Sequence, residues 1–258
     1  MPKRKDAIYG APCWLDLSTS DLDRAKGFYG GLFGWSPSGT GEAFGHYTNM
    51  SKDGALVAAM SPKMDPAQAD VPDAWNLYFA VQDVEKASES VRNAGGTLLF
   101  DVMQVADAGS MTMFTDPTGG VSGIWQPGTH RGFGLVNQPG APVWFELMTR
   151  DVPAAESFYG QVLDVEIADG SEDAHAMTYK TLNVDGDAHA GIFDGTGMFP
   201  DGVPPQWVIY FGVDDIDAAV RYVDANGGKG LSPPVDSSHG RWASVADPTG
   251  ARFLIMQV

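Results

Sequence analysis

The chain repeats itself, and this repetition constrains its fold more than any other feature of the sequence. The segment Gly10–Leu17 (GAPCWLDL) returns as Gly140–Leu147 (GAPVWFEL), and Asp21–Gly30 (DLDRAKGFYG) returns as Asp151–Gly160 (DVPAAESFYG). Further matches, in the same order and at offsets of 130 to 132 residues, are Tyr47 with Tyr179, Trp75–Asp83 with Trp207–Asp215, and Asp116–Gly119 with Asp247–Gly250. Repeats that keep their order in this way predict two tandem copies of one fold.

Each copy is itself made of two similar halves. In the first copy, alternating polarity predicts a strand over residues 13–18, and the helical spacing of apolar residues predicts a helix that begins at Ser20 or Asp21 and ends at Gly34. The pattern restarts with a strand over 75–81 and a helix over 84–94. Shorter strands are predicted around 45–49, 56–60, 111–114 and 121–125. The chain therefore reads as four strand–helix–strands modules, with domains at 8–126 and 139–258 and a Gly- and Pro-rich linker at 127–138.

Composition excludes several classes of partner. The 258 residues include 16 basic and 33 acidic side chains, and the resulting net charge of −17 repels nucleic acid and anionic membrane surfaces. A single cysteine, Cys13, excludes an internal disulfide and fits a reducing compartment. The sequence has neither a signal-peptide pattern nor an apolar run of about 18 residues. We expect a cytoplasmic protein, a monomer or homodimer, whose partner is a small molecule.

Two motifs connect the chain with a known family. The pattern D-x-x-x-A-x-x-F-Y follows the first strand of each copy, and D-P-x-G precedes the last strand. This arrangement resembles the vicinal oxygen chelate superfamily of glyoxalases, bleomycin-resistance proteins and ring-cleaving dioxygenases. More narrowly, it is similar to tandem two-domain glyoxalase-like proteins of the mycobacterial culture-filtrate antigen type and to accessory proteins of actinobacterial polyketide biosynthesis. The resemblance implies an α+β fold of four βαβββ modules, in two domains whose curled mixed sheets form cups.

The resemblance also indicates where metal ligands would lie. Metal-dependent members use the first strand of each module, seven residues before the helix-opening Asp, and a Glu on the last strand. The corresponding residues here are Trp14, Asn76 and Gly123 in the first copy, and Trp144, Val208 and Leu254 in the second. Divalent metals prefer imidazole or carboxylate ligands, and in this set only Asn76 offers even an amide oxygen. We therefore expect neither the usual metal nor another cofactor in either cup. The alternative is an unusual metal site elsewhere in the cup, which would serve a metal-dependent lyase or glyoxalase acting on methylglyoxal-like substrates.

The five histidines do not restore a metal site. They are His46, His130, His175, His189 and His239, and none of them lies at H-x-H or H-x-x-x-H spacing from another. Polar surface or partly buried positions explain them more simply. We keep His46 as a candidate ligand contact because it falls in a predicted strand.

Side-chain alternation then predicts what faces each cup. With the family's ligand positions pointing inward, the opposite face of each copy's first strand is wholly apolar and packs under the helix. The candidate ligand-binding residues are Trp14, Asn76, Tyr78 and Trp125 in the first copy and Trp144, Tyr210 and the rim residue Trp242 in the second, with Asp16 and Glu146 as inward carboxylates. Aromatic faces with a few polar groups suit a flat hydrophobic ligand, and Gly123 leaves room for one.

Three functions are compatible with this lining. The first is metal-independent binding of a hydrophobic or aromatic metabolite, antibiotic-like or polyketide-like, for sequestration or as a biosynthetic helper. The second is enzymatic, a lyase, glyoxalase or hydroxylase-type reaction on a small carbonyl or aromatic substrate, with Asp16 or Glu146 as the general acid or base after desolvation raises its pKa. The third is structural, each carboxylate being bound by backbone amides or by Arg131, Arg150 or Arg241.

The two copies also differ at equivalent positions. The first has the polar residues Asp16 and Asn76, whereas the second has Val208 in place of Asn76 and Leu254 in place of Gly123. A buried polar group is costly without a hydrogen-bond partner, and a ligand would supply one. The sequence therefore predicts that the first cup is the more open one and the second a packed scaffold.

Overall fold

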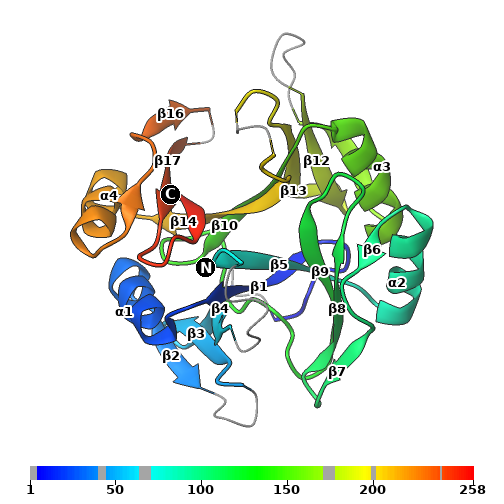
Figure 1. Cartoon of the computed structure of the whole chain (residues 1–258), viewed down its shortest axis with the longest axis horizontal. Helices are drawn as coiled ribbons and strands as arrows, with labels where there is room; N and C mark the ends of the chain where they lie inside the picture. Colours follow the sequence, from blue (N-terminus) through cyan, green and yellow to red (C-terminus); the bar gives the residue numbers. More distant parts are fainter. Residues whose placement is uncertain (1–4, 40–44, 64–70, 171–177, 199–201, 239) are drawn as a thin grey trace.

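Each copy of the repeat folds into its own curled sheet with two helices (Figure 1). The structure, a computed structural model, describes residues 5–39, 45–63, 71–170, 178–198, 202–238 and 240–258. The first copy contains β1 (Pro12–Thr19), α1 (Leu22–Phe33), β2 (Ser36–Gly39), β3 (Thr48–Lys52), β4 (Ala55–Pro62), β5 (Ala74–Ala80), α2 (Val84–Asn93), β6 (Thr97–Leu98), β7 (Met103–Val105), β8 (Gly109–Thr115) and β9 (Val121–Pro127). The second contains β10 (Pro142–Thr149), α3 (Val152–Leu163), β11 (Glu166–Asp169), β12 (Tyr179–Val184), β13 (Asp187–Asp194), β14 (Gln206–Val213), α4 (Ile216–Ala225), β15 (Lys229–Gly230), β16 (Val235–Ser237), β17 (Gly240–Ala246) and β18 (Arg252–Gln257).

The two modules of a copy pair with each other, so each cup is built within one copy. Over the described residues, the first sheet has the order β2-β3-β4-β1-β5-β9-β8-β6, and the second has the equivalent order β11-β12-β13-β10-β14-β18-β17-β15. The modules join through the antiparallel pairs β1–β5 and β10–β14, with parallel neighbours on either side. In this register Asp16 lies opposite Asn76, and Glu146 lies opposite Val208. The predicted α+β fold with mixed curled sheets is confirmed.

In each module an aspartate directly before the helix caps its N-terminus. The carboxylates of Asp21, Asp83, Asp151 and Asp215 each accept a hydrogen bond from a backbone N–H in the first turn of α1, α2, α3 or α4. An Asp at this position satisfies N–H groups that the helix itself leaves unpaired. At the other end of α1, Gly34 has a φ of +71°, which glycine adopts without the strain that a side chain would add. The repeated Asp therefore has a structural role.

The Phe-Tyr pair of the motif joins the two copies. Tyr29 on α1 donates to Asp247 of the second copy over 3.1 Å, and Tyr159 on α3 donates to Asp116 of the first copy over 2.8 Å. Each tyrosine also accepts from an indole of its own copy, Trp75 or Trp207. All of these groups are buried. The F-Y and D-P-T-G motifs of one copy are thus completed by the other copy.

Residues 127–138 pack against the first domain instead of running through solvent. Phe133, Leu135 and Val136 are buried, and the backbone N–H of Phe133 bonds to the carbonyl of Cys13 on β1. Gly132 has a φ of +93°, and a Cβ there would lie 2.4 Å from that same carbonyl oxygen. The segment is therefore both a connection and a packed part of the first cup. No helix in the described part of the chain is long and apolar enough to cross a membrane.

Candidate functional site

A hydrogen-bonded network centred on Asp16 lies inside the first cup. The Trp14 indole donates to the Tyr47 hydroxyl over 2.8 Å, and the Tyr47 and Tyr78 hydroxyls donate to Asp16 Oδ2 over 3.3 and 3.1 Å. The Asn76 amide donates to Asp16 Oδ1 over 2.9 Å. The network thus brings together four residues that were predicted to face the cup, together with Tyr47. The four are Trp14 and Asp16 on β1 and Asn76 and Tyr78 on β5.

The second cup repeats this network around Glu146. The Trp144 indole donates to the Tyr179 hydroxyl over 2.8 Å, and Tyr179 donates to Glu146 Oε1 over 2.7 Å. Tyr210 donates to Glu146 Oε2 over 2.5 Å. One sequence-based interpretation had an arginine bound to each carboxylate. Within the described residues no arginine bonds to Asp16 or Glu146, and Arg241 pairs instead with exposed aspartates.

The tyrosine hydroxyls are held in their protonated form. Burial is the larger cause and the nearby Asp16 carboxylate the second cause that raises the pKa values of Tyr47 and Tyr78 well above the ordinary value for tyrosine. Burial and Glu146 raise the pKa of Tyr179 and Tyr210 in the same way. Burial also raises the pKa of Asp16 itself, against the opposing effect of its three hydrogen-bond donors. Each phenol is therefore fixed as a donor to the carboxylate.

The segment that follows β9 closes the first cup. The His130 ring packs edge-on against Trp14, with ring centroids 4.3 Å apart, and lies 5.6 Å from the Trp125 ring. The Trp125 indole also donates to the His130 backbone carbonyl over 3.1 Å. As a result Trp14, Asp16 and Trp125 are 4%, 8% and 6% exposed. The chain's own imidazole thus occupies the aromatic face that the sequence assigned to a ligand.

The equivalent side chains of the second cup are more exposed to solvent than those of the first. Trp144 and Glu146 are half-exposed there. Val208, Tyr210 and Leu254 form an apolar cluster separate from the main core, with the half-buried Val143, Trp144, Met148, Trp242 and Met256 packed on it. In the first cup the corresponding aromatic residues are part of the main core. The prediction that the first cup is the more open one is therefore wrong.

The donors that a metal would require do not meet at the family's ligand positions. In the second copy these positions carry an indole and two aliphatic side chains. In the first, the space beside Gly123 is filled by Tyr78, because a Cβ on Gly123 would lie 2.3 Å from that ring. The expectation that Gly123 leaves room for a ligand is therefore wrong. Among the described residues no group of three His, Cys, Asp or Glu could hold a metal ion.

The histidines occupy unrelated places. His46 is exposed, in the turn before β3, and its backbone has a φ of +60° instead of the predicted strand geometry. It borders a surface hollow of about 470 Å³ with Ser20 and Thr48, away from the Asp16 network. His189 is half-buried on β13. His175 and His239 lie outside the described residues.

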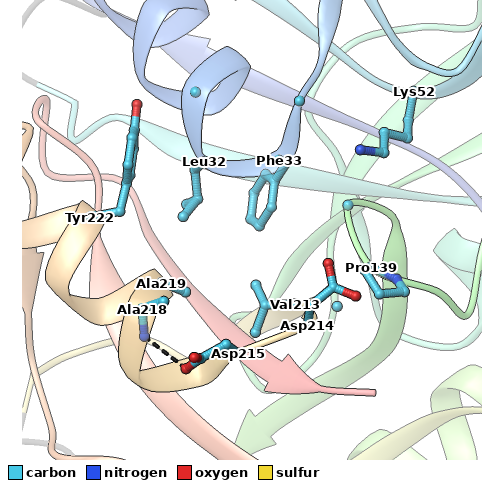
Figure 2. Close-up of a pocket in the computed structure, with 14 residues that line it drawn as sticks. Leu32, Phe33, Lys52, Pro139, Val213, Asp214, Asp215, Ala218, Ala219 and Tyr222 are labelled. Carbon is cyan, nitrogen blue, oxygen red and sulfur yellow. Dashed lines mark hydrogen bonds between the residues drawn. The ribbon is translucent and has the colours of Figure 1, made fainter.

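A further crevice, of about 390 Å³, lies between the two copies (Figure 2). The C-terminal turn of α1 and the first turn of α4 form its walls, with Lys52 and Pro139 at the other side. Two acids, Asp214 and Asp215, line it, and the Asp215 carboxylate already caps α4 by accepting from the Ala218 N–H. None of the residues predicted to bind a ligand lines this crevice.

The half-buried His130 predicts a specific pH dependence of stability. Burial lowers its pKa from 6.5 to about 4, so the unfolded chain takes up a proton at a higher pH than the folded one. Its neutral ring therefore contributes stability that is complete above pH 6.5 and is lost as the pH falls towards 4. The variant His130→Phe keeps an aromatic ring without a titrating group. When the pH is lowered from 7 to 5, we expect the free energy of unfolding to fall by about 1–2 kcal/mol more in the wild type than in this variant. Thermal denaturation at each pH measures this difference. Parallel pH profiles would contradict this.

Comparisons with known proteins place the chain among its relatives. The family model described as Glyoxalase/Bleomycin resistance protein/Dioxygenase superfamily matches residues 13–121 and 141–255, once in each copy. CFP32 of Mycobacterium tuberculosis, described as a candidate glyoxylase, is 38% identical over 264 residues, which cover 100% of this chain and 98% of that protein. The anthracycline biosynthesis protein DauV of Streptomyces sp. strain C5 is 34% identical over 262 residues, covering 96% of this chain and 94% of that protein.

Solved structures share the fold at low sequence identity. The Mn(II)-bound glyoxalase from Novosphingobium aromaticivorans superposes with a TM-score of 0.66 at 15% identity, covering 96% of this chain and 82% of that one. The 2,3-dioxygenase LapB from Pseudomonas sp. KL28 gives the same TM-score at 14% identity, covering 98% of this chain and 93% of that one. At such identities the likeness concerns the arrangement of strands and helices.

Proposed function

The chain belongs to the Glyoxalase/Bleomycin resistance protein/Dioxygenase superfamily, and from this premise we propose that it binds a small, planar, largely apolar metabolite in its second cup without a metal. The observation that carries the proposal is the apolar cluster beside Glu146. Its centre, formed by Val208, Tyr210 and Leu254, is buried, and it is covered by half-buried side chains that include Trp144 and Trp242. Apolar side chains on a concave surface, with a few oriented polar groups, are typical of small-molecule sites.

The relatives support an aromatic polyketide-like ligand. DauV and the Streptomyces peucetius protein DnrV, 33% identical over 261 residues, are both described as anthracycline biosynthesis proteins. Anthracyclines are planar and polycyclic, and such a ring system would match the aromatic faces of Trp144 and Tyr210. For this chain we propose a part in the biosynthesis of an aromatic metabolite, as a helper or carrier of that metabolite.

Binding is favoured over acid–base catalysis by Asp16, because this carboxyl is closed off from a substrate. Asp16 has the raised pKa that a general acid needs, but it lies in the closed cup behind Trp14 and His130. Glu146 lies in the open cup, where Tyr179 and Tyr210 each donate one hydrogen bond to it. A general acid or base must reach its substrate, which Asp16 does not do in this conformation.

A ligand panel tests the proposal. Anthracyclinone aglycones and substituted naphthalenes would be titrated into the protein, with tryptophan fluorescence and melting temperature as readouts. We expect saturable quenching and a rise in melting temperature, since a ligand that binds only the folded state stabilises it. Saturated cyclic hydrocarbons of equal size serve as the control and should bind more weakly. If no aromatic compound in the panel changed either signal, the proposal would be wrong.

A further inference from the structure

The two cups differ in how completely their carboxylates are hydrogen-bonded. Asp16 accepts three side-chain hydrogen bonds, from Asn76, Tyr47 and Tyr78. Glu146 accepts two within the described residues, both from tyrosines, because Val208 stands where the first copy has Asn76. A carboxylate has about four acceptor positions, so Glu146 retains room for another donor.

No cation of the described chain neutralises this carboxylate. Three basic side chains of the second copy have other partners: Lys180 pairs with acids on α3 and β11, Arg241 pairs with exposed aspartates, and Arg150 donates to a backbone carbonyl. None of them forms an ion pair with Glu146. The open cup thus presents a half-exposed carboxylate with spare acceptor positions, on an apolar and aromatic surface.

We propose that the ligand of the second cup carries a protonated amine, and that Glu146 binds this ammonium group while the apolar cluster binds the rest of the molecule. This inference rests on the proposed function and adds the charge class of the ligand to it. An ammonium group would give Glu146 the additional hydrogen-bond donor that Asn76 gives to Asp16 in the first cup. The indole face of Trp144 beside the carboxylate adds a second attraction for a cation. The net charge of −17 raises the local concentration of cations and repels anionic ligands.

Three probes that share one ring system isolate the charge. They are naphthalen-2-ylmethanamine, naphthalen-2-ylmethanol and 2-naphthoate, which are cationic, neutral and anionic at pH 7. Isothermal titration calorimetry at fixed salt gives the Kd of each. We expect the amine to bind about tenfold more tightly than the alcohol, since a charge-assisted hydrogen bond in a partly desolvated site is stronger than a neutral one. The carboxylate should bind most weakly.

Two variants in the cup and one control on the surface test whether this preference comes from Glu146. Glu146→Gln keeps the shape of the side chain and one oxygen that accepts from a tyrosine hydroxyl, while its amide NH2 replaces the second acceptor. It removes the charge, so the preference for the amine should fall to near unity. Glu166→Gln, at an exposed position on β11, makes the same change in net charge and should keep the preference. Val208→Asn places next to Glu146 the amide found in the first cup, and should weaken amine binding even where Glu146→Gln folds poorly.

The outcomes separate this inference from the proposed function. If none of the probes bound, the proposed function itself would fail. Equal Kd values for the three probes would leave that function standing and overturn the amine preference. The inference would also be wrong if Glu146→Gln and Glu166→Gln kept the same preference, because the attraction would then come from the overall acidity of the protein.

Discussion

Replacing Tyr159 by Phe should lower the free energy of unfolding by about 2–4 kcal/mol, although the change removes one oxygen atom. This hydroxyl donates to Asp116 of the other copy over 2.8 Å and accepts from the Trp207 indole over 2.9 Å. All three side chains are buried. The variant leaves a buried carboxylate oxygen and a buried indole N–H without these partners, and each unsatisfied group costs about 1–3 kcal/mol. Denaturant unfolding of purified protein measures the difference.

The repeat and the surface supply matched controls for this variant. Tyr29→Phe breaks the equivalent contact with Asp247 and should have a similar cost. Tyr9 is 44% exposed, so Tyr9→Phe should change stability by less than about 0.5 kcal/mol. If Tyr159→Phe behaved like Tyr9→Phe, the hydroxyl would not be what joins the two copies.

Alanine at the two equivalent tryptophans should have opposite consequences. Trp14 is 4% exposed under His130 and Phe133, so Trp14→Ala should cost about 3–5 kcal/mol of stability and leave ligand affinity nearly unchanged. Trp144 is half-exposed in the open cup, so Trp144→Ala should cost less stability and raise the Kd for an aromatic ligand roughly tenfold or more. Melting temperature and calorimetric Kd values for both variants check this.

Any loss of fold in Trp14→Ala has to be separated from loss of binding. The Kd is therefore measured at a temperature well below the melting transition of each variant, with the fraction of folded protein taken from circular dichroism. The account is contradicted if Trp14→Ala loses binding while folded, or if Trp144→Ala proves the more destabilising change.

The sequence predicted the fold because the signals that define it are local and occur twice. The capping aspartates, the alternation along β1 and β10 and the glycine that ends α1 each act over a few residues. Their repetition made the two domains evident, and the same alternation placed Asp16, Asn76 and Tyr78 on one face. The short edge strands β6 and β15 were not predicted, because two residues carry too little periodicity.

The openness of each cup could not be predicted from its own lining, because a segment outside the lining decides it. The sequence-based comparison weighed Asn76 against Val208, but the packing of His130 on Trp14 determines which cup is closed. Signals of this packing were present in the linker, since Phe133, Leu135 and Val136 are apolar and Gly132 takes a positive φ. A segment that only spans two domains in solvent has no need of buried apolar residues.

The most direct test of which cup binds uses the indole N–H signals of the seven tryptophans in nitrogen-15 NMR spectra, assigned by single Trp→Phe variants. During titration with naphthalen-2-ylmethanamine, an aromatic ligand in the second cup should shift the signals of Trp144 and Trp242. The signals of Trp14 and Trp125, whose N–H groups are bound to Tyr47 and to the His130 carbonyl, should stay in place. Saturable shifts of Trp14 and Trp125 with Trp144 and Trp242 unmoved would contradict the account.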